Sequence, residues 1–401
     1  MIILILLGEI IFYIIALLLL IPASVFFVEC MAALLPRRQA PLASQVPRPK
    51  TTVIVPAHNE ATVIPACLGS VQPHLGERDR LVVVADNCED DTAEVARRCG
   101  AVVVERHDPK RRGKGYALDY GLRFVATDPP DVLVVLDADC IVQERLLEEI
   151  ASLAFSSGRP VQAAYVLQPP QHPEPRALIS AFAFVMKNVI RPAGLTRLGL
   201  PCFLTGTGMA FPWSVLDGVS LASSKTAEDM RLAVNLALAG HPPMFDARSC
   251  VTGCLPQQER IAKNQRTLWE HGHLDTLLKD APRLFKAAAC QRSSALLAMG
   301  FDLCVPPISL LVLLWTIAIS ATVLWAAITA VWGPAALVAG AGLLVCLAVI
   351  ASWVSFGRST VPLSALVNVP AYVALKIPLY LAFLVSRRTE WAFREREKVD
   401  R

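Results

Sequence analysis

Two aspartates, Asp137 and Asp139, follow the apolar run 132–136 in an Asp-x-Asp pattern. Side chains in a strand repeat every two residues, so a strand that continued to Asp139 would point both carboxylates to the same side. Two such carboxylates can hold a hard divalent cation whose shell is completed by water and phosphate oxygens. Aspartate is also favoured at helix N-caps and in turns, so the pattern alone does not decide the chemistry.

Polar residues follow two other apolar runs in the same part of the chain. His58 and Glu60 come after the first run, and Asp86 ends the second in an Asp-Asn pair that would also suit a turn. The basic stretch 111–114 can be either a phosphate-binding loop or a solvated one. Asp229 precedes the helical pattern 230–240, where it can be a proton-accepting base or an ordinary acid in a first helical turn.

The elements around these residues alternate between strand and helix. Val-rich strands are predicted over 51–57, 80–86, 101–105 and 131–139, with helices over 61–75 and 91–99 and from Gly115 onward. Continuous apolar strands between helices indicate an α/β domain with a mostly parallel sheet covered on both faces. Ligands of such sheets bind beyond the carboxyl ends of the strands, where the polar residues stand.

The ends of the chain predict membrane segments. The uncharged run 10–28 is long enough, at about 1.5 Å per residue, to span roughly 30 Å of bilayer core. A cleaved signal peptide would need a basic start, which the opening MIILILLGE lacks. Further apolar stretches cover 304–331, 335–356 and 361–385, and the last is interrupted by three prolines and Lys376. We therefore expect that last segment to be kinked and partly interfacial or re-entrant rather than a simple span.

Basic residues after the first span orient the chain. Arg37, Arg38, Arg48 and Lys50 favour a cytoplasmic position for the central part, in a multi-pass protein of the inner (cytoplasmic) membrane. A basic amphipathic stretch over 275–292 suits either a membrane surface or a solvated helix. The expected organisation is an anchor at 1–36, a cytoplasmic domain at 37–274, an interfacial segment at 275–302, membrane segments at 303–386 and a basic tail at 387–401.

Composition excludes several classes of protein. The net charge of +4 is small and scattered, which argues against a nucleic-acid partner. The 11 cysteines are scattered, as in a reduced compartment, and Cys250 with Cys254 is a weak zinc pattern. A transporter is disfavoured because the predicted spans lack paired ionisable residues; Glu9 and Lys376 are the candidates, and both can snorkel.

Seven motifs in order resemble those of glycosyltransferase family 2. The resemblance covers roughly 51–300 and is strongest to the membrane-embedded branch that includes cellulose, hyaluronan, chitin and poly-N-acetylglucosamine synthases and ceramide glucosyltransferases. No single motif is specific to the family. Seven motifs in the family's order, with a membrane segment on each side, are unlikely to occur together by chance. The motifs are VIVPAHNE at 53–60, VVVADNCEDDT at 82–92, RGKGYALD at 112–119, VLDAD at 135–139, GTGMAF at 206–211, AED at 227–229 and QRTLWEHG at 265–272.

The resemblance implies a GT-A fold and an inverting transfer from a nucleotide-diphosphate sugar, with a UDP-sugar as the expected donor. Asp137 and Asp139 would hold Mg²⁺ or Mn²⁺ at the diphosphate, and Asp229 would be the general base with Glu228 beside it. The other implied residues are Pro56, His58, Glu60, Asp86, Lys114 and Asp137 on the donor side, and Gly206, Thr207, Gly208, Gln265, Arg266 and Trp269 on the acceptor or diphosphate side.

The last motif departs from the family pattern Gln-x-x-Arg-Trp, because Leu268 stands where the arginine is expected. Trp269 can still stack on an acceptor sugar, and Gln265 can still donate a hydrogen bond. The missing cation would come from elsewhere, with Arg266 or Arg260 as candidates. The stretch 257–261 keeps Gln and Arg at the same spacing but lacks the tryptophan.

Three functional hypotheses follow. The first is a glycosyltransferase that extends an exopolysaccharide, with a glycan acceptor and an export partner or homo-oligomer to complete a channel. The second adds a single sugar to a lipid carrier or membrane lipid, which suits the small number of predicted spans. The third is a non-catalytic scaffold or nucleotide-sugar sensor in a secretion complex, suggested by Leu268.

Overall fold

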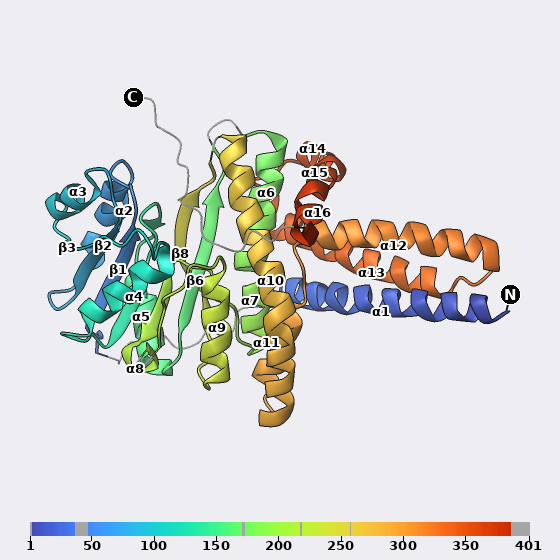
Figure 1. Cartoon of the computed structure of the whole chain (residues 1–401), viewed down its shortest axis with the longest axis horizontal. Helices are drawn as coiled ribbons and strands as arrows, with labels where there is room; N and C mark the ends of the chain where they lie inside the picture. The colour runs from blue at the N-terminus through green and yellow to red at the C-terminus, as the bar shows by residue number, and fades with distance from the viewer. Residues whose placement is uncertain (1, 37–46, 171–172, 217–218, 257, 386–401) are drawn as a thin grey trace.

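The computed structural model describes residues 2–36, 47–170, 173–216, 219–256 and 258–385. An α/β domain forms one part, and a bundle of long helices projects from it (Figure 1). Arg37, Arg38 and the tail 387–401 lie outside the described residues, as do the predictions made for them.

The first half of the sheet follows the strand prediction closely. Strands β1 (Thr51–Ala57), β2 (Arg80–Asp86), β3 (Val102–Arg106) and β4 (Val132–Val135) pair in parallel in the order β3-β2-β1-β4. The valine side chains of β1, β2 and β4 are buried on both faces, and α2 (Ile64–Val71), α3 (Thr92–Arg98) and α4 (Lys114–Val125) cover the sheet; Val102 of the edge strand β3 is 46% exposed. A 3-10 turn over Gln72–His74 follows α2 and completes the helical region predicted over 61–75.

Strand β4 is shorter than predicted. It ends at Val135, so the Asp-x-Asp pair lies in the turn beyond it, where the Cys140 amide donates to the Asp137 carbonyl over 3.1 Å. The Asp137 amide leaves the ladder and donates to the Thr207 hydroxyl over 3.0 Å. The expectation that strand alternation places both carboxylates on one side was therefore wrong, and a turn brings them together instead.

The second half of the sheet is mixed. Strand β7 (Met209–Pro212) runs antiparallel to β4, and the remaining strands are β6 (Val161–Gln168), β8 (Met244–Cys254) and β5 (Ile141–Val142). Four of the strand pairings are parallel and three are antiparallel, so the sheet is mostly parallel as predicted. Helices α5 (Leu146–Ser157), α8 (Trp213–Leu216) and α9 (Glu228–Leu238) complete this half.

The bundle consists of α1 (Ile2–Ala32), α12 (Ile308–Thr329) and α13 (Gly333–Ser352), with a π-helical end at Trp353–Gly357. These helices lie side by side and project from the α/β domain (Figure 1). By length and composition, four described helices could cross a membrane: Ile5–Ala32, Pro175–Arg197, Ile308–Thr329 and Gly333–Gly357. The helix over Pro175–Arg197 is not among the membrane segments predicted from the sequence.

That additional helix differs from the bundle helices. It is formed by α6 (Pro175–Val185), a π-helical turn at Met186–Ile190 and α7 (Arg191–Arg197). Of its most apolar 18-residue stretch, 67% is buried inside the protein. Figure 1 shows it running across the direction of the bundle, as do α10 (Glu259–Gln291) and α11 (Ser294–Leu303). These helices thus form a layer between the sheet and the bundle.

The last apolar segment is broken into three short helices, α14 (Leu363–Leu366), α15 (Val369–Leu375) and α16 (Ile377–Val385). The breaks agree with the predicted kinking. The interfacial or re-entrant position stays a prediction, as does the division of the chain into segments. The boundary placed at 274/275 falls inside α10, which continues without interruption from the motif at 265–272.

A buried ion cluster joins α1 to this layer. Arg191 donates from Nε to the Glu29 carboxylate over 2.6 Å and also pairs with Asp302. Gly194 allows the close approach, because a Cβ there would lie 1.8 Å from the Glu29 carbonyl oxygen. Removing one partner of such a buried cluster costs about 3–5 kcal/mol, so it holds the layer firmly against α1.

Candidate active site

A cavity of about 1170 Å³ lies beyond the carboxyl ends of β1, β2 and β4 and extends to the bundle. At one end it is lined by the polar residues of the strand ends, and at the other by side chains of α12, α13 and α15. Most of the predicted site residues line it: Pro56, His58, Glu60, Asp86, Lys114, Asp137, Asp139, Gly206, Glu228, Asp229, Gln265, Arg266 and Trp269.

Thr207 and Gly208 lie behind the cavity wall. Thr207 is fully buried, and its hydroxyl accepts the hydrogen bond from the Asp137 amide. A Cβ at Gly208 would lie 2.8 Å from Val251, so this glycine permits close packing between β7 and β8. The structure therefore gives these two residues supporting contacts, while Gly206 alone of the three lines the cavity.

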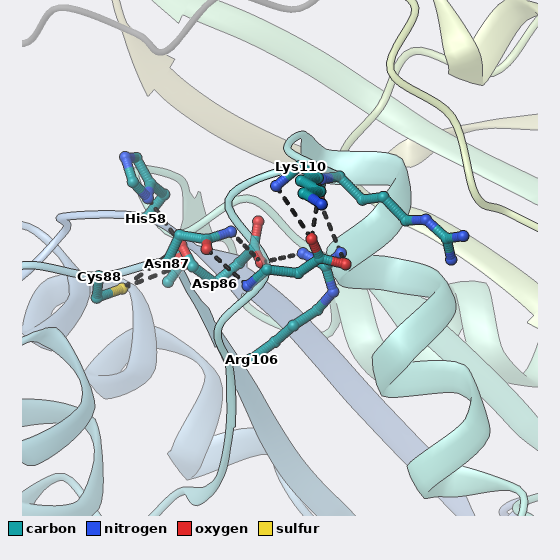
Figure 2. A network of polar contacts seen from close by, with 9 residues as sticks. His58, Asp86, Asn87, Cys88, Arg106 and Lys110 are labelled. Carbon is teal, nitrogen blue, oxygen red and sulfur yellow. Dashed lines mark hydrogen bonds and ion pairs between the residues drawn. The ribbon is translucent and has the colours of Figure 1, made fainter.

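Asp86 belongs to a polar network at the end of β2 (Figure 2). Its Oδ1 accepts hydrogen bonds from Arg106 Nη1 over 2.5 Å and from the side-chain Nδ2 of Asn87 over 2.9 Å. His58 Nδ1 lies 2.7 Å from the Asp86 carbonyl oxygen. Arg106 also lies over the Tyr116 ring, at 5.7 Å from its centroid. The network holds the Asp86 carboxylate in place, where it can accept a hydrogen bond from a nucleobase or ribose.

The sequence analysis missed Arg106, although its position contained a usable signal. Arg106 is the last residue of β3, which is parallel to β2, and it pairs in register with Asp86. The rule that polar residues at parallel strand ends gather at one edge therefore applies to it as well.

Lys114 connects two walls of the cavity. It begins α4, forms an ion pair with Asp137 and donates to the Gly206 carbonyl over 2.7 Å. Burial would lower the pKa of Lys114, but the charges of Asp137, Glu228 and Asp229 raise it. Gly206 adopts a φ of +90°, a conformation that favours glycine, and so turns its carbonyl toward the lysine. The ammonium thus stays charged where a diphosphate would need it.

Asp137, Asp139 and Cys140 form a group that could hold a metal ion, with ligand atoms within 4.8 Å of one another. Burial, Asp139 and Asp137 raise the pKa of the Cys140 thiol well above its ordinary value, and its sulfur is a softer donor than the oxygens that hard divalent cations take. The two carboxylates are the hard oxygen donors that Mg²⁺ and Mn²⁺ prefer. The residues present thus fit the predicted divalent cation.

The acidic pair lies at the start of α9, opposite Lys114. Ala227, just before it, has a φ of +57°, a conformation that L-residues rarely adopt. Burial raises the pKa of Asp229, while the Met230 amide, Lys114 and Lys187 lower it. Burial and then the charge of Asp229 raise the pKa of Glu228 to about 7. Carboxylates with pKa values raised in this way are suited to accept a proton near neutral pH.

The motif at 265–272 lies on α10 and faces the cavity. Gln265, Arg266, Leu268 and Trp269 all line it. Trp269 packs on Phe184, with ring centroids 5.6 Å apart, and Arg266 pairs with Glu259 over 3.1 Å. Two cations were proposed to replace the expected arginine. Arg266 lines the cavity, whereas Arg260 is not among the lining residues.

Lys376 does not snorkel, contrary to the expectation from sequence. It lies between α15 and α16, forms an ion pair with Glu270 and lies 4.7 Å from the centroid of the Tyr372 ring. All three residues line the cavity. Sequence patterns could not pair Glu270 with Lys376, because the broken last segment has to fold back onto α10 before the two meet.

Comparison with known proteins agrees with this geometry. Residues 47–272 match the family model described as glycosyltransferase-like family 2. The chain belongs to this family. A relative is the probable glycosyltransferase YdaM of Bacillus subtilis, 24% identical over 259 residues that cover 59% of this chain and 58% of YdaM. Another is the O-antigen chain rhamnosyltransferase RfbN of Salmonella typhimurium, 24% identical, with 50% of this chain and 65% of RfbN covered.

The matches thus span less than two thirds of either curated relative. Among solved structures, the family 2 chain is similar to the mannosyltransferase PcManGT from Pyrobaculum calidifontis in complex with GDP-Man and Mn²⁺. The TM-score is 0.53 at 19% identity, and the alignment covers 86% of this chain and 98% of PcManGT. The predicted family and the predicted GT-A fold are both confirmed.

Proposed function

We propose that this family 2 glycosyltransferase is a membrane-bound inverting enzyme that transfers one sugar from a nucleotide-diphosphate donor to a lipid acceptor. The observation that favours a lipid is the cavity, which continues from the acidic pair to apolar side chains of the bundle, among them Val312, Val345 and Val349. Its lining also includes Ile350, which is 57% exposed on α13. An acceptor with an apolar tail could therefore enter sideways from a bilayer, with its head group toward Asp229.

The donor end has the groups that a nucleotide sugar requires. Asp86, held by Arg106, would bind the nucleoside, and Lys114 would lie beside the diphosphate. A divalent cation held by Asp137 and Asp139 would supply positive charge to the departing diphosphate. The complex of PcManGT with GDP-Man and Mn²⁺ supports a metal and a nucleotide sugar, although the base of the donor used here can be uridine or guanosine.

The proposed transfer needs a base at the acceptor hydroxyl and cationic groups at the departing diphosphate. The acceptor hydroxyl oxygen forms a bond to the anomeric carbon as the bond from that carbon to the diphosphate oxygen breaks, and the diphosphate leaves with the bonding electrons. Asp229 takes the hydroxyl proton. Attack from the face opposite the leaving group inverts the anomeric carbon, which requires the base and the cationic groups to lie on different sides of the sugar.

A second candidate is the extension of an exopolysaccharide. Trp269 lines the cavity and can stack on a glycan ring. The printed name of RfbN, an O-antigen chain rhamnosyltransferase, also fits a glycan product. Both candidates place the catalytic domain on the cytoplasmic side of the inner membrane, and the polymer candidate would additionally use an export partner or a homo-oligomer.

The test is nucleoside-diphosphate release by the detergent-purified chain over a panel of UDP- and GDP-sugars, with Mn²⁺ or Mg²⁺ and extracted membrane lipids. Release that depends on one donor, on metal and on Asp229 would support the enzyme. A radiolabelled product that moves into chloroform–methanol would support the lipid acceptor, and a product of high molecular mass would favour the polymer.

The matched control is Glu94→Gln, which removes an exposed carboxylate on α3. It should leave release unchanged, whereas Asp229→Asn should abolish it. If no donor gives release even with lipids and acceptor sugars present, the enzyme proposal fails and the scaffold hypothesis gains.

A further inference from the structure

Lys187 and Asn188 are two polar side chains in the cavity that the proposed chemistry does not use. Both lie on the π-helical turn Met186–Ile190 and line the cavity. Asn188 is 4% exposed. Among the residues that the structure describes, neither side chain forms a hydrogen bond or ion pair. Both side chains line the cavity without a hydrogen-bond partner in the described part of the chain, so they are available to a ligand that enters it.

The turn lies between the base and the membrane anchor. The charge of Lys187 acts on Asp229, while the turn itself contacts α1. Arg191, which follows the turn, is held by Glu29 of α1 and by Asp302. This ion cluster fixes the turn in place, so the two unpaired groups are presented to the cavity by a rigid support.

One sign of this position is visible in the sequence. Lys187 is the lone charge between residues 177 and 190, in a mainly apolar stretch whose other polar residues are Ser180 and Asn188. A charge kept within such a stretch commonly serves a function, and here the structure turns it toward the cavity rather than toward solvent.

We propose that Lys187 and Asn188 bind a phosphate group of the lipid acceptor. The proposal rests on the proposed function and names the acceptor class as a phosphate-bearing lipid. An ammonium offers three donors and a carboxamide two, which suits several phosphate oxygens at once. Hydrogen bonds from a charged donor to phosphate are about twice as strong as neutral ones. The lipid chain would continue from this phosphate along the apolar cavity wall formed by α12 and α13.

The donor diphosphate is served by other groups. Lys114 and the Asp137–Asp139 pair lie at the strand ends, whereas Lys187 comes from the layer of helices beside the bundle. Binding of donor and binding of the acceptor phosphate should therefore respond to different substitutions.

Binding is tested with farnesyl phosphate in detergent micelles. Farnesol is the control ligand that lacks the charge, and inorganic phosphate is the control ligand that lacks the lipid tail. We expect Lys187→Gln to weaken farnesyl phosphate binding by about tenfold or more, the effect of losing a charged hydrogen bond. Asn188→Asp, which adds a negative charge at the same volume, should weaken it too. Lys187→Arg should restore most of the affinity, and farnesol should bind all variants alike.

The matched control is Lys286→Gln, which removes an exposed lysine from α10 and should leave farnesyl phosphate binding unchanged. The proposal is overturned if farnesyl phosphate binds Lys187→Gln as tightly as the unaltered chain. It is also overturned if inorganic phosphate competes as well as the lipid phosphate, which would indicate a site for free phosphate.

A third arm measures binding of UDP and GDP with Mn²⁺. If Lys187→Gln binds the nucleotides as tightly as the unaltered chain does, the result supports an acceptor subsite. If Lys187→Gln loses as much affinity for the nucleotides as for farnesyl phosphate, the lysine belongs to the donor site and the proposal is overturned. The arms also separate the two proposals. A chain that binds farnesyl phosphate through Lys187 but releases no nucleotide from any donor would refute the proposed function while leaving the phosphate site.

Discussion

On the strand-end side of the cavity, proposed to bind the donor, the charged side chains pair with one another. On the helical side, proposed to bind the acceptor, Lys187 and Asn188 form no hydrogen bond or ion pair within the described residues. Asp86 is held by Arg106 and Asp137 by Lys114. The donor end is built from strand ends close together in one sheet, and the acceptor end from helices that belong to distant parts of the chain. The difference teaches that the strand ends hold their charged groups in ion pairs, whereas the helical side leaves Lys187 and Asn188 available to a ligand.

The largest effect should come from Asp229→Asn, which tests whether the two ends of the cavity act independently. We expect transfer to fall by about 10²–10⁴-fold, because the amide cannot accept the acceptor proton, while nucleotide binding with Mn²⁺ stays nearly unchanged. Turnover and calorimetric titration of the nucleoside diphosphate measure the two quantities. A matching loss of nucleotide affinity would show that Asp229 belongs to the donor end.

Asp139→Ala should act on the donor end alone. We expect metal-dependent nucleotide affinity to fall on the order of 10- to 100-fold, because one of two carboxylate ligands is lost. Titration of UDP or GDP with and without Mn²⁺ measures the change, and Glu144→Ala, an exposed carboxylate in the next turn, is the matched control. Unaltered affinity in the presence of metal would remove Asp139 from the cation site.

Glu228 should make stability depend on pH. Its pKa is raised from 4.5 to about 7 by burial and Asp229, so between these pH values the folded chain binds a proton that the unfolded chain has lost. The free energy of unfolding contributed by this group therefore falls as pH rises through that interval. From pH 5 to pH 8 the Tm in detergent should fall by a few degrees more for the unaltered chain than for Glu228→Gln.

Glu94→Gln, which alters an exposed carboxylate on α3, is the matched control and should keep the slope of the unaltered chain. The same pH slope in Glu228→Gln and in the unaltered chain would contradict the raised pKa.

The smallest effect should come from Leu268→Arg at the acceptor end. Leu268 lines the cavity, so the new guanidinium would supply the cation of the usual family pattern, and we expect activity to be unchanged or to rise by about threefold or less. Steady-state kinetics with the active donor measures it. Leu278→Arg, at a leucine that is 51% exposed on the same helix, is the matched control. A sharp loss of activity in Leu268→Arg but not in Leu278→Arg would mean that the cavity lining at position 268 requires a leucine.

Sequence patterns were most reliable where local residues decide the structure. Strands β1 and β2 have the predicted bounds, because Val-rich runs between turn residues leave few alternatives. The prediction for β4 was too long, since the Asp137 amide bonds to Thr207, a residue far away in the sequence. The antiparallel strands beyond β4 were not predicted for the same reason: their partners are distant, and only the folded chain pairs them.

The same division holds for the site. The ordered motifs by themselves determined the family, the strand-end carboxylates and the acidic pair at the start of α9, because each is a short stretch whose chemistry is local. Only the tertiary structure decided that Arg106 holds Asp86, that Lys376 pairs with Glu270 and that Lys187 faces the cavity. These arrangements depend on which helices and strands pack together, and the contacts that select that packing join residues far apart in the chain.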